Sequence, residues 1–190
     1  MATLFVNACL RGEDSRTLQL CREYLADTPN VEEVDLAALK LQPLYAEDVK
    51  LRTRLQNDGN FGDSIFDLAR QFAAADEIVV GAPYWDLSFP SALKVYFEHV
   101  SVCGVCFAYS PEGRPSGLCC ARRAVYITTC GGSIAVANDG FDYVSDLFNK
   151  LFCIPQTACV AAELLDVVGT DVGAQMDKAR KQIALLKQQH

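Results

Sequence analysis

Short apolar runs alternate along this chain with segments in which apolar residues recur at helical spacing. The apolar runs predict five strands, at residues 3–6, 31–36, 77–82, 124–129 and 157–162. The helical spacing predicts helices that begin near Ser15 and Ser64, helices over residues 89–100 and 141–151, and a last helix around 176–186. This alternation predicts an α/β chain with a parallel sheet covered by helices on both faces.

Two stretches interrupt this pattern and are predicted to lie at the rim of the fold. Residues 39–61 form a long connection, with a short helix expected over residues 47–56. Residues 103–120 form a second excursion that is rich in Gly and Pro. Connections of this length are usually functional or mobile. No internal repeat or composition break divides the chain, so residues 1–190 are expected to form one domain.

The order of the five strands follows from two observations. Right-handed crossovers leave few possible topologies. The chain has neither a GxGxxG nor a GxxxxGK[ST] motif, which disfavours a Rossmann dinucleotide site or a P-loop. We therefore expect a flavodoxin-like three-layer sandwich with strand order 2-1-3-4-5, whose ligand site lies outside the carboxyl ends of the strands.

Charge and hydropathy narrow the range of partners. The net charge is −7 and no basic stripe occurs, so nucleic acid is not expected as a partner. No apolar run reaches the roughly 18 residues that a membrane helix needs. Residues 3–6 follow no basic segment, which predicts a first strand rather than a signal peptide. The expected location is the cytoplasm.

Nine cysteines invite a metal or redox interpretation. Cys103 and Cys106 form a CxxC pair, and Cys119 and Cys120 follow it, which could supply half of a metal or iron–sulfur site. The alternative is that they are small apolar residues at a helix end and in a loop. No second CxxC occurs, and this one follows a helix, unlike redox-active pairs between strand and helix. We expect no metal. Periodic apolar segments contain or flank Cys21, Cys130, Cys153 and Cys159, which predicts buried thiols in a reducing cytoplasm.

The loop after the first strand, residues 7–17, leads into a helix N-terminus. Free backbone N–H groups at such an end bind anions, and the helix dipole favours negative charge. Ser15 and Thr17 add hydroxyl groups, and Arg11 or Arg16 could offset the charge of a phosphate. The alternative is that Ser15 only caps the helix.

Two further loops follow the third and fourth strands. The loop from Pro83 to Leu87 carries Tyr84 and Trp85, the only Trp of the chain. The other loop contains Gly131 and Gly132, which let a backbone approach a ligand ring closely. The aromatic residues could equally pack in the core, and the glycines could form an ordinary turn. Together with the anion loop, however, the three loops would line one edge of the sheet as a site for flavin mononucleotide (FMN).

The order and spacing of these motifs resemble the flavin-dependent NAD(P)H quinone oxidoreductase and azoreductase family of the flavodoxin-like superfamily. The resemblance covers most of the chain. It rests on Ala-Pro-Tyr-Trp at 82–85, Leu-Lys-Val-Tyr-Phe at 93–97, Gly-Val-Cys-Phe-Ala-Tyr at 104–109, Gly-Leu at 117–118 and Thr-Thr-Cys-Gly-Gly at 128–132.

The resemblance implies a homodimer with two active sites at its interface and FMN bound without a covalent link; FAD is the alternative flavin. It implies ping-pong hydride transfer from NAD(P)H to a quinone, an azo compound or a similar electron-poor aromatic. The flavin carries this chemistry, so no catalytic side chain is required. The rival functions are a flavodoxin-like electron carrier that serves protein partners, and an iron–sulfur flavoprotein that uses the four cysteines at 103–120.

The resemblance also assigns roles to individual residues. The residues implied for the phosphate are Ser15, Arg16 and Thr17, with Cys9 nearby. Those implied for the isoalloxazine ring are Pro83, Tyr84, Trp85, Asp86 and Leu87 on one side and Thr129, Cys130, Gly131 and Gly132 on the other. Tyr109 and Phe152 match positions that supply aromatic cover over the flavin, in part from the partner subunit.

Three positions depart from the commoner pattern of the family. Cys9 stands where Ser is frequent, Asp86 where Asn is frequent, and Cys130 where some members have Arg. A carboxylate beside the flavin would disfavour its anionic reduced form. The loss of an Arg is expected to alter the choice of substrate or nicotinamide.

Overall fold

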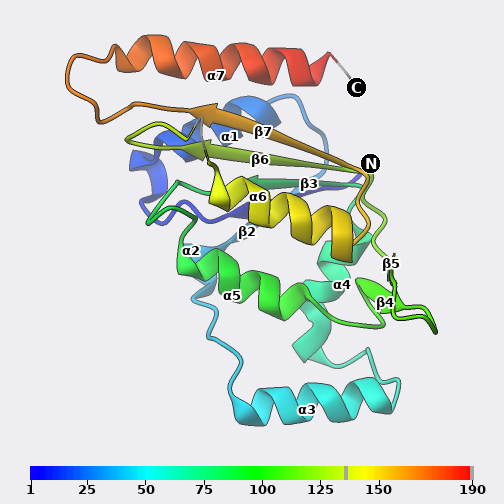
Figure 1. Ribbon diagram of the computed structural model, residues 1–190. Coiled ribbons are helices and arrows are strands. Elements are labelled where there is room, and N and C mark those ends of the chain that lie inside the picture. Colours follow the sequence, from blue (N-terminus) through cyan, green and yellow to red (C-terminus); the bar gives the residue numbers. More distant parts are fainter. Residues whose placement is uncertain (135–136, 189–190) are drawn as a thin grey trace.

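A five-stranded parallel sheet forms the centre of the molecule (Figure 1). The structure is a computed structural model that describes residues 1–134 and 137–188. The strands of this sheet are β1 (Thr3–Asn7), β2 (Val31–Asp35), β3 (Glu77–Gly81), β6 (Arg123–Thr129) and β7 (Gln156–Ala162). Their spatial order is β2-β1-β3-β6-β7. Since β6 and β7 are the fourth and fifth strands of this sheet along the chain, the predicted order 2-1-3-4-5 is confirmed.

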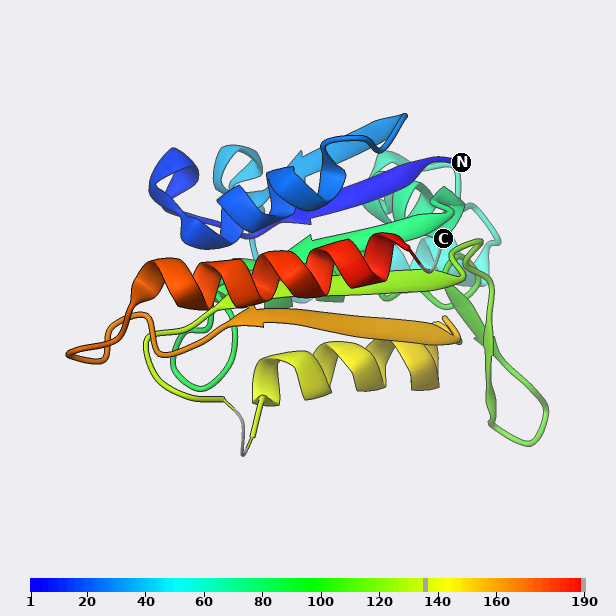
Figure 2. The same ribbon diagram turned by 90° about the horizontal axis from the view of Figure 1, so that it is seen from above.

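Helices cover both faces of the sheet, as expected from the central strands, which are apolar on both sides. One face carries α1 (Arg16–Leu25) and α7 (Val172–Lys187), which lie on the same side of the sheet in Figure 2. The other face carries α4 (Asp67–Ala74), α5 (Ser91–Val100) and α6 (Asp139–Asp146). Successive side chains of β1, β3 and β6 enter these two cores in turn.

Three helices begin or end differently from the prediction, for local reasons. The helix expected from Ser64 starts as a 3₁₀ turn, η2 (Ser64–Phe66), because Asp63 caps it by accepting the Ile65 N–H at 3.0 Å. Helix α5 begins at Ser91 because Pro90 is extended, with ψ 139°. Helix α6 continues as a π turn, η3 (Leu147–Leu151).

The connection at residues 39–61 holds the predicted helix, α3 (Ala46–Asn57), which follows the short α2 (Leu36–Leu39). In Figure 1, α3 lies beyond α5, far from the sheet. Arg52 anchors it: this buried guanidinium donates hydrogen bonds to the carbonyl oxygens of Glu98 and Ser101, at 3.0 and 3.2 Å. Those carbonyls belong to the C-terminal end of α5, where a cation also interacts favourably with the helix dipole.

The excursion at residues 103–120 contains a small hairpin that the sequence pattern did not predict. Its strands are β4 (Phe107–Tyr109) and β5 (Pro115–Gly117), which pair antiparallel. The hairpin lies at the edge of the sheet where the strands begin (Figure 1). Gly117 allows it to approach η3, since a Cβ there would lie 2.2 Å from the carbonyl oxygen of Phe152. Among the described residues, no helix is long and apolar enough to cross a membrane.

Candidate functional site

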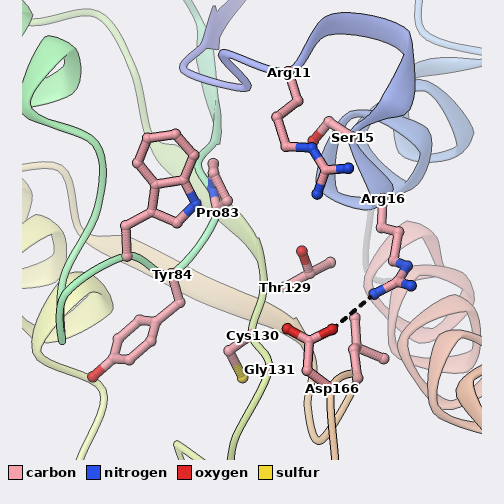
Figure 3. Close-up of a pocket in the computed structure, with 11 residues that line it drawn as sticks. Arg11, Ser15, Arg16, Pro83, Tyr84, Thr129, Cys130, Gly131 and Asp166 are labelled. Atoms are coloured by element: carbon pink, nitrogen blue, oxygen red, sulfur yellow. Dashed lines mark hydrogen bonds and ion pairs between the residues drawn. The ribbon is translucent and has the colours of Figure 1, made fainter.

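A cavity of about 150 Å³ opens at the carboxyl edge of the sheet (Figure 3). Its lining comes from the loops after β1, β3, β6 and β7. The lining residues are Arg11, Ser15, Arg16, Pro83, Tyr84, Trp85, Thr129, Cys130, Gly131, Leu165 and Asp166. The first three of these loops are those that the sequence indicated, so the structure brings together the anion loop, the aromatic loop and the glycine loop.

One side of the cavity is built to receive an anion. Ser15 caps α1, and its Oγ accepts a hydrogen bond from the Leu18 N–H at 3.3 Å. The backbone N–H groups of Arg16 and Thr17 make no hydrogen bond within the described chain. The side chain of Arg11 points toward the cavity (Figure 3) and likewise has no ion-pair partner among residues 1–134 and 137–188. Free N–H groups, the helix dipole and a free cation together favour a phosphate.

Thr17 and Cys9 lie beneath this side rather than in the cavity wall. The Thr17 side chain is buried, and its hydroxyl is hydrogen-bonded to that of Thr129 at 2.7 Å. Only its backbone N–H therefore remains for a phosphate. Cys9 is also buried, and its thiol contacts the carbonyl oxygen of Gly81 at 3.6 Å. A hydrogen bond with Cys21 is the main cause that lowers the pKa of Cys9.

The aromatic loop forms a second wall. The backbone N–H of Tyr84 donates to the carbonyl oxygen of Thr129 at 3.0 Å, which fixes this loop against β6. Trp85 and Ser88 exchange two backbone hydrogen bonds, at 3.1 and 2.8 Å, and so close a two-residue turn. Burial is the main cause that raises the pKa of Tyr84, so its phenol is neutral at physiological pH.

Asp86 and Leu87 are the two residues at the tip of this turn, and neither lines the cavity. Their φ angles are 50° and 66°, the left-handed region that side chains other than Gly rarely adopt. Their side chains are exposed, that of Leu87 to 70%. Within this chain, the Asp86 carboxylate is therefore directed to solvent rather than to the cavity.

The glycine loop forms the third wall. The backbone N–H of Cys130 donates to the carbonyl oxygen of Ala162 at 3.0 Å, and the Cys130 thiol donates to that of Gly132 at 3.0 Å. Burial, helped by Glu163, raises the pKa of Cys130 to about 11. This thiol is therefore neutral at physiological pH and is not an activated nucleophile. Gly132 itself is exposed and does not line the cavity.

Sequence reasoning missed the loop after β7, which supplies Leu165 and Asp166 to the cavity. The Asp166 carboxylate forms an ion pair with Arg16 at 3.5 Å across the cavity (Figure 3). The one available signal was position: this loop follows the carboxyl end of an edge strand beside β6, so it reaches the same rim of the sheet.

Comparison with known proteins identifies relatives over the full length of the chain. A family described as having a flavodoxin-like fold matches residues 1–184. The FMN-dependent NADH:quinone oxidoreductase 2 of Clostridium acetobutylicum is 34% identical, and the match covers 94% of this chain and 96% of that protein. The FMN-dependent NADH:quinone oxidoreductase of Lachnoclostridium phytofermentans is 31% identical, with 96% of each chain covered. The chain belongs to this flavodoxin-like oxidoreductase family.

Solved structures agree with the family's fold. An azoreductase from Bacillus anthracis strain Sterne superposes with a TM-score of 0.83 at 22% identity and covers 100% of both chains. An FMN-dependent NADH-azoreductase from Bacillus anthracis strain Ames Ancestor, crystallised with FMN, superposes with a TM-score of 0.81 at 21% identity, with 96% of each chain covered.

Two residues that family resemblance assigned to cover the flavin lie far from the cavity of their own chain. Tyr109 is 55% exposed on β4, at the opposite edge of the sheet. Phe152 is 1% exposed in the core, and its ring lies 5.0 Å from that of Phe72 and 5.8 Å from that of Phe148. Within this chain, Phe152 does not cover the cavity, because other aromatic rings enclose its ring in the core.

The family's flavodoxin-like fold does not gather the cysteines at 103–120 into a metal site. Among the described residues, no group of three or more His, Cys, Asp or Glu side chains lies close enough to hold a metal ion. Cys119 instead donates to the carbonyl oxygen of Cys106 at 3.3 Å, and Cys106 is buried.

Proposed function

We propose that this protein is an FMN-dependent NAD(P)H oxidoreductase that reduces quinones, azo compounds or similar electron-poor aromatics. The observation that carries the proposal is the cavity, which joins an anion-binding helix N-terminus to an aromatic wall at one edge of the sheet. The relatives are named as FMN-dependent NADH:quinone oxidoreductases, which supports a flavin and a nicotinamide substrate for this chain as well.

The residues of the cavity fit FMN. The free N–H groups of Arg16 and Thr17, with Ser15 and Arg11, would hold the phosphate. Pro83, Tyr84 and Trp85 would line one side of the isoalloxazine ring, and Cys130 and Gly131 the other. When bound, FMN supplies a centre that accepts hydride from NAD(P)H and passes it to the second substrate in a separate half-reaction.

The chain's own contribution is to position the flavin and to keep the side chains of the aromatic and glycine loops uncharged where they face the ring. The Cys130 thiol and the Tyr84 phenol are neutral, so neither places a negative charge against the ring. Asp86 points to solvent in this chain, so its carboxylate does not oppose the anionic form of a reduced ring. Stacking of the two substrates in turn would place the reacting atoms at about 3–3.5 Å.

A second copy of the chain completes the site in this proposal. A cavity of about 150 Å³ is small, because ligand pockets generally enclose about 300–1,000 Å³. Tyr109 is exposed at the opposite edge of the sheet, away from this chain's own cavity, and in this proposal it covers the flavin of a second subunit. Nine free cysteines, none of them in a disulfide, support a reducing compartment such as the cytoplasm.

Reconstitution tests the proposal. Full-length protein is incubated with FMN or FAD, freed of excess flavin, and assayed with NADH and NADPH against a quinone and an azo dye. We expect a yellow protein, release of FMN on denaturation, and parallel lines in double-reciprocal plots, which indicate ping-pong kinetics. A colourless protein without NAD(P)H-dependent reduction would overturn the proposal, and flavin binding without turnover of small acceptors would favour an electron carrier.

A further inference from the structure

The cavity proposed for FMN contains a carboxylate beside its anion-binding side. Asp166 projects into the cavity and faces Arg16, with Oδ1 3.5 Å from Nη1 (Figure 3). A phosphate that enters at the N-terminus of α1 meets this negative charge. It also meets a guanidinium that already has a counter-ion, whereas Arg11 has none among the described residues.

The fold holds Asp166 in this position through its backbone. Three consecutive N–H groups, of Leu164, Leu165 and Asp166, donate to the carbonyl oxygens of Gly132, Cys130 and Gly131 at 2.9, 3.1 and 3.1 Å. Leu164 adopts a left-handed φ of 63° to make this possible. The loop after β7 is therefore tied to the glycine loop, and Asp166 does not enter the cavity by free rotation of a surface loop.

The absence of a side chain at Gly131 leaves room for the Asp166 carboxylate. A Cβ at residue 131 would lie 2.5 Å from Oδ2 of Asp166, so any larger residue there would displace the carboxylate. The carboxylate therefore occupies a defined place between Arg16 on α1 and the backbone of the glycine loop. Its side chain remains 76% exposed and that of Arg16 47% exposed, so an incoming anion can compete for the guanidinium.

We propose that Asp166 is a specificity-determining residue that limits the affinity of the cavity for the phosphate of its flavin. It does so by competing with the phosphate for Arg16 and by repelling its negative charge. The inference rests on the proposed function, since it presumes that a flavin binds here. Riboflavin has no phosphate, so its affinity is independent of this competition. Asp166 thus narrows the difference in affinity between FMN and riboflavin.

The test compares two flavins on two proteins. Dissociation constants of FMN and riboflavin are measured by quenching of flavin fluorescence for the flavin-free wild type and Asp166→Asn. We expect FMN to bind about twofold to fivefold more tightly to the variant at low salt, as removal of one largely exposed charge implies. Riboflavin affinity should not change. The gain should shrink at 0.5 M salt, because screening weakens exposed charges.

A double-mutant cycle locates the effect at Arg16. In an Arg16→Gln background the gain in FMN affinity from Asp166→Asn should shrink but not vanish, because the competition for the guanidinium is lost while the direct repulsion of the phosphate remains. An undiminished gain would overturn the competition for Arg16. Asp27→Asn is the matched control: it removes the same charge from an exposed side chain that pairs with Lys187, after the far end of α1. Inorganic phosphate, used as a competitor of FMN, should also bind more tightly to Asp166→Asn.

Each other outcome has a distinct meaning. An unchanged ratio of FMN to riboflavin affinity would overturn the inference while leaving the proposed function intact. Equal weakening of both flavins would assign Asp166 a structural role only and also overturn it. Failure of both flavins to bind the wild type would overturn the proposed function itself.

Discussion

Individual residues around the cavity have two roles. Some face the cavity, where a ligand would bind, and others hold those residues in place. Ser15 and Arg11 face the cavity, whereas Thr17 lies beneath it. The Thr17 hydroxyl connects α1 to β6 through Thr129, at 2.7 Å. The sequence motif identifies these residues together but does not separate the two roles, because the direction of a side chain depends on tertiary packing.

Loss of the hydrogen bond between Thr17 and Thr129 tests this supporting role. Thr17→Val removes the buried hydroxyl with little change in shape, and Thr17→Ser keeps it. We expect Thr17→Val to lower the free energy of unfolding by about 1 kcal/mol, measured by urea denaturation, and Thr17→Ser to lower it less. Equal stability of the Val variant and the wild type would contradict the role.

The thiol of Cys130 should make stability fall at alkaline pH. Its pKa is raised to about 11 in the fold, whereas an unfolded Cys ionises near 8.5. The neutral thiol therefore stabilises the fold fully below about pH 8.5, and this contribution is lost as the pH rises toward 11. The difference in urea midpoint between wild type and Cys130→Ala should accordingly change between pH 8 and 11 and remain constant from pH 6 to 8.

At the level of elements, the apolar runs were sufficient to predict every strand of the main sheet. The hairpin β4–β5 was not predictable, since each strand has three residues and the segment is rich in Gly and Pro. Asp166 was likewise missed, because no motif distinguishes its loop; its place depends on three backbone hydrogen bonds to the glycine loop. Short strands and loop-to-loop contacts are fixed by packing and not by local pattern.

A buried polar network ties three elements together at the amino edge of the sheet. Glu77 on β3 accepts a hydrogen bond from the Tyr24 hydroxyl of α1 at 2.8 Å and faces Arg123 of β6 at 3.7 Å. Glu77→Ala leaves a nearly buried guanidinium without this carboxylate and should cost about 3 kcal/mol of stability. Tyr24→Phe should cost about 1 kcal/mol.

Urea denaturation measures both losses. The network lies at the edge of the sheet away from the cavity, so flavin affinity of the folded Tyr24→Phe protein should match that of the wild type. A large loss of flavin affinity in this variant would show that the two edges are coupled.

At the scale of the whole molecule, the proposed site and the hairpin with Tyr109 occupy opposite edges of one sheet. In a homodimer, each subunit can offer its cavity to one site and its hairpin to the other. The Tyr109 side chain would then act only on the partner's flavin.

Mixed dimers test this arrangement. Tyr109→Ala should lower kcat by about twofold to tenfold, the effect of losing one aromatic stacking contact, while leaving the dimer intact in size-exclusion chromatography with light scattering. A dimer that combines one Tyr109→Ala subunit with one subunit whose phosphate side is disabled by Arg11→Glu should keep one intact site, because the intact cavity of the first subunit meets the intact hairpin of the second. If Tyr109 acted on the flavin of its own chain, this mixed dimer would have no intact site and would be as inactive as the weaker parent. Full activity of Tyr109→Ala would contradict aromatic cover by this residue.

The turn between Trp85 and Ser88 carries a consequence for engineering of this protein. Two successive residues with side chains, Asp86 and Leu87, adopt a conformation that Asn-Gly would adopt with less strain. Replacing them by Asn and Gly should raise the melting temperature by about 2–4 °C for each kcal/mol of strain relieved. It would also remove the Leu87 side chain, which is exposed to solvent. A search for heat-resistant variants would therefore select changes in this turn, and because neither side chain lines the cavity, such variants should keep their flavin affinity.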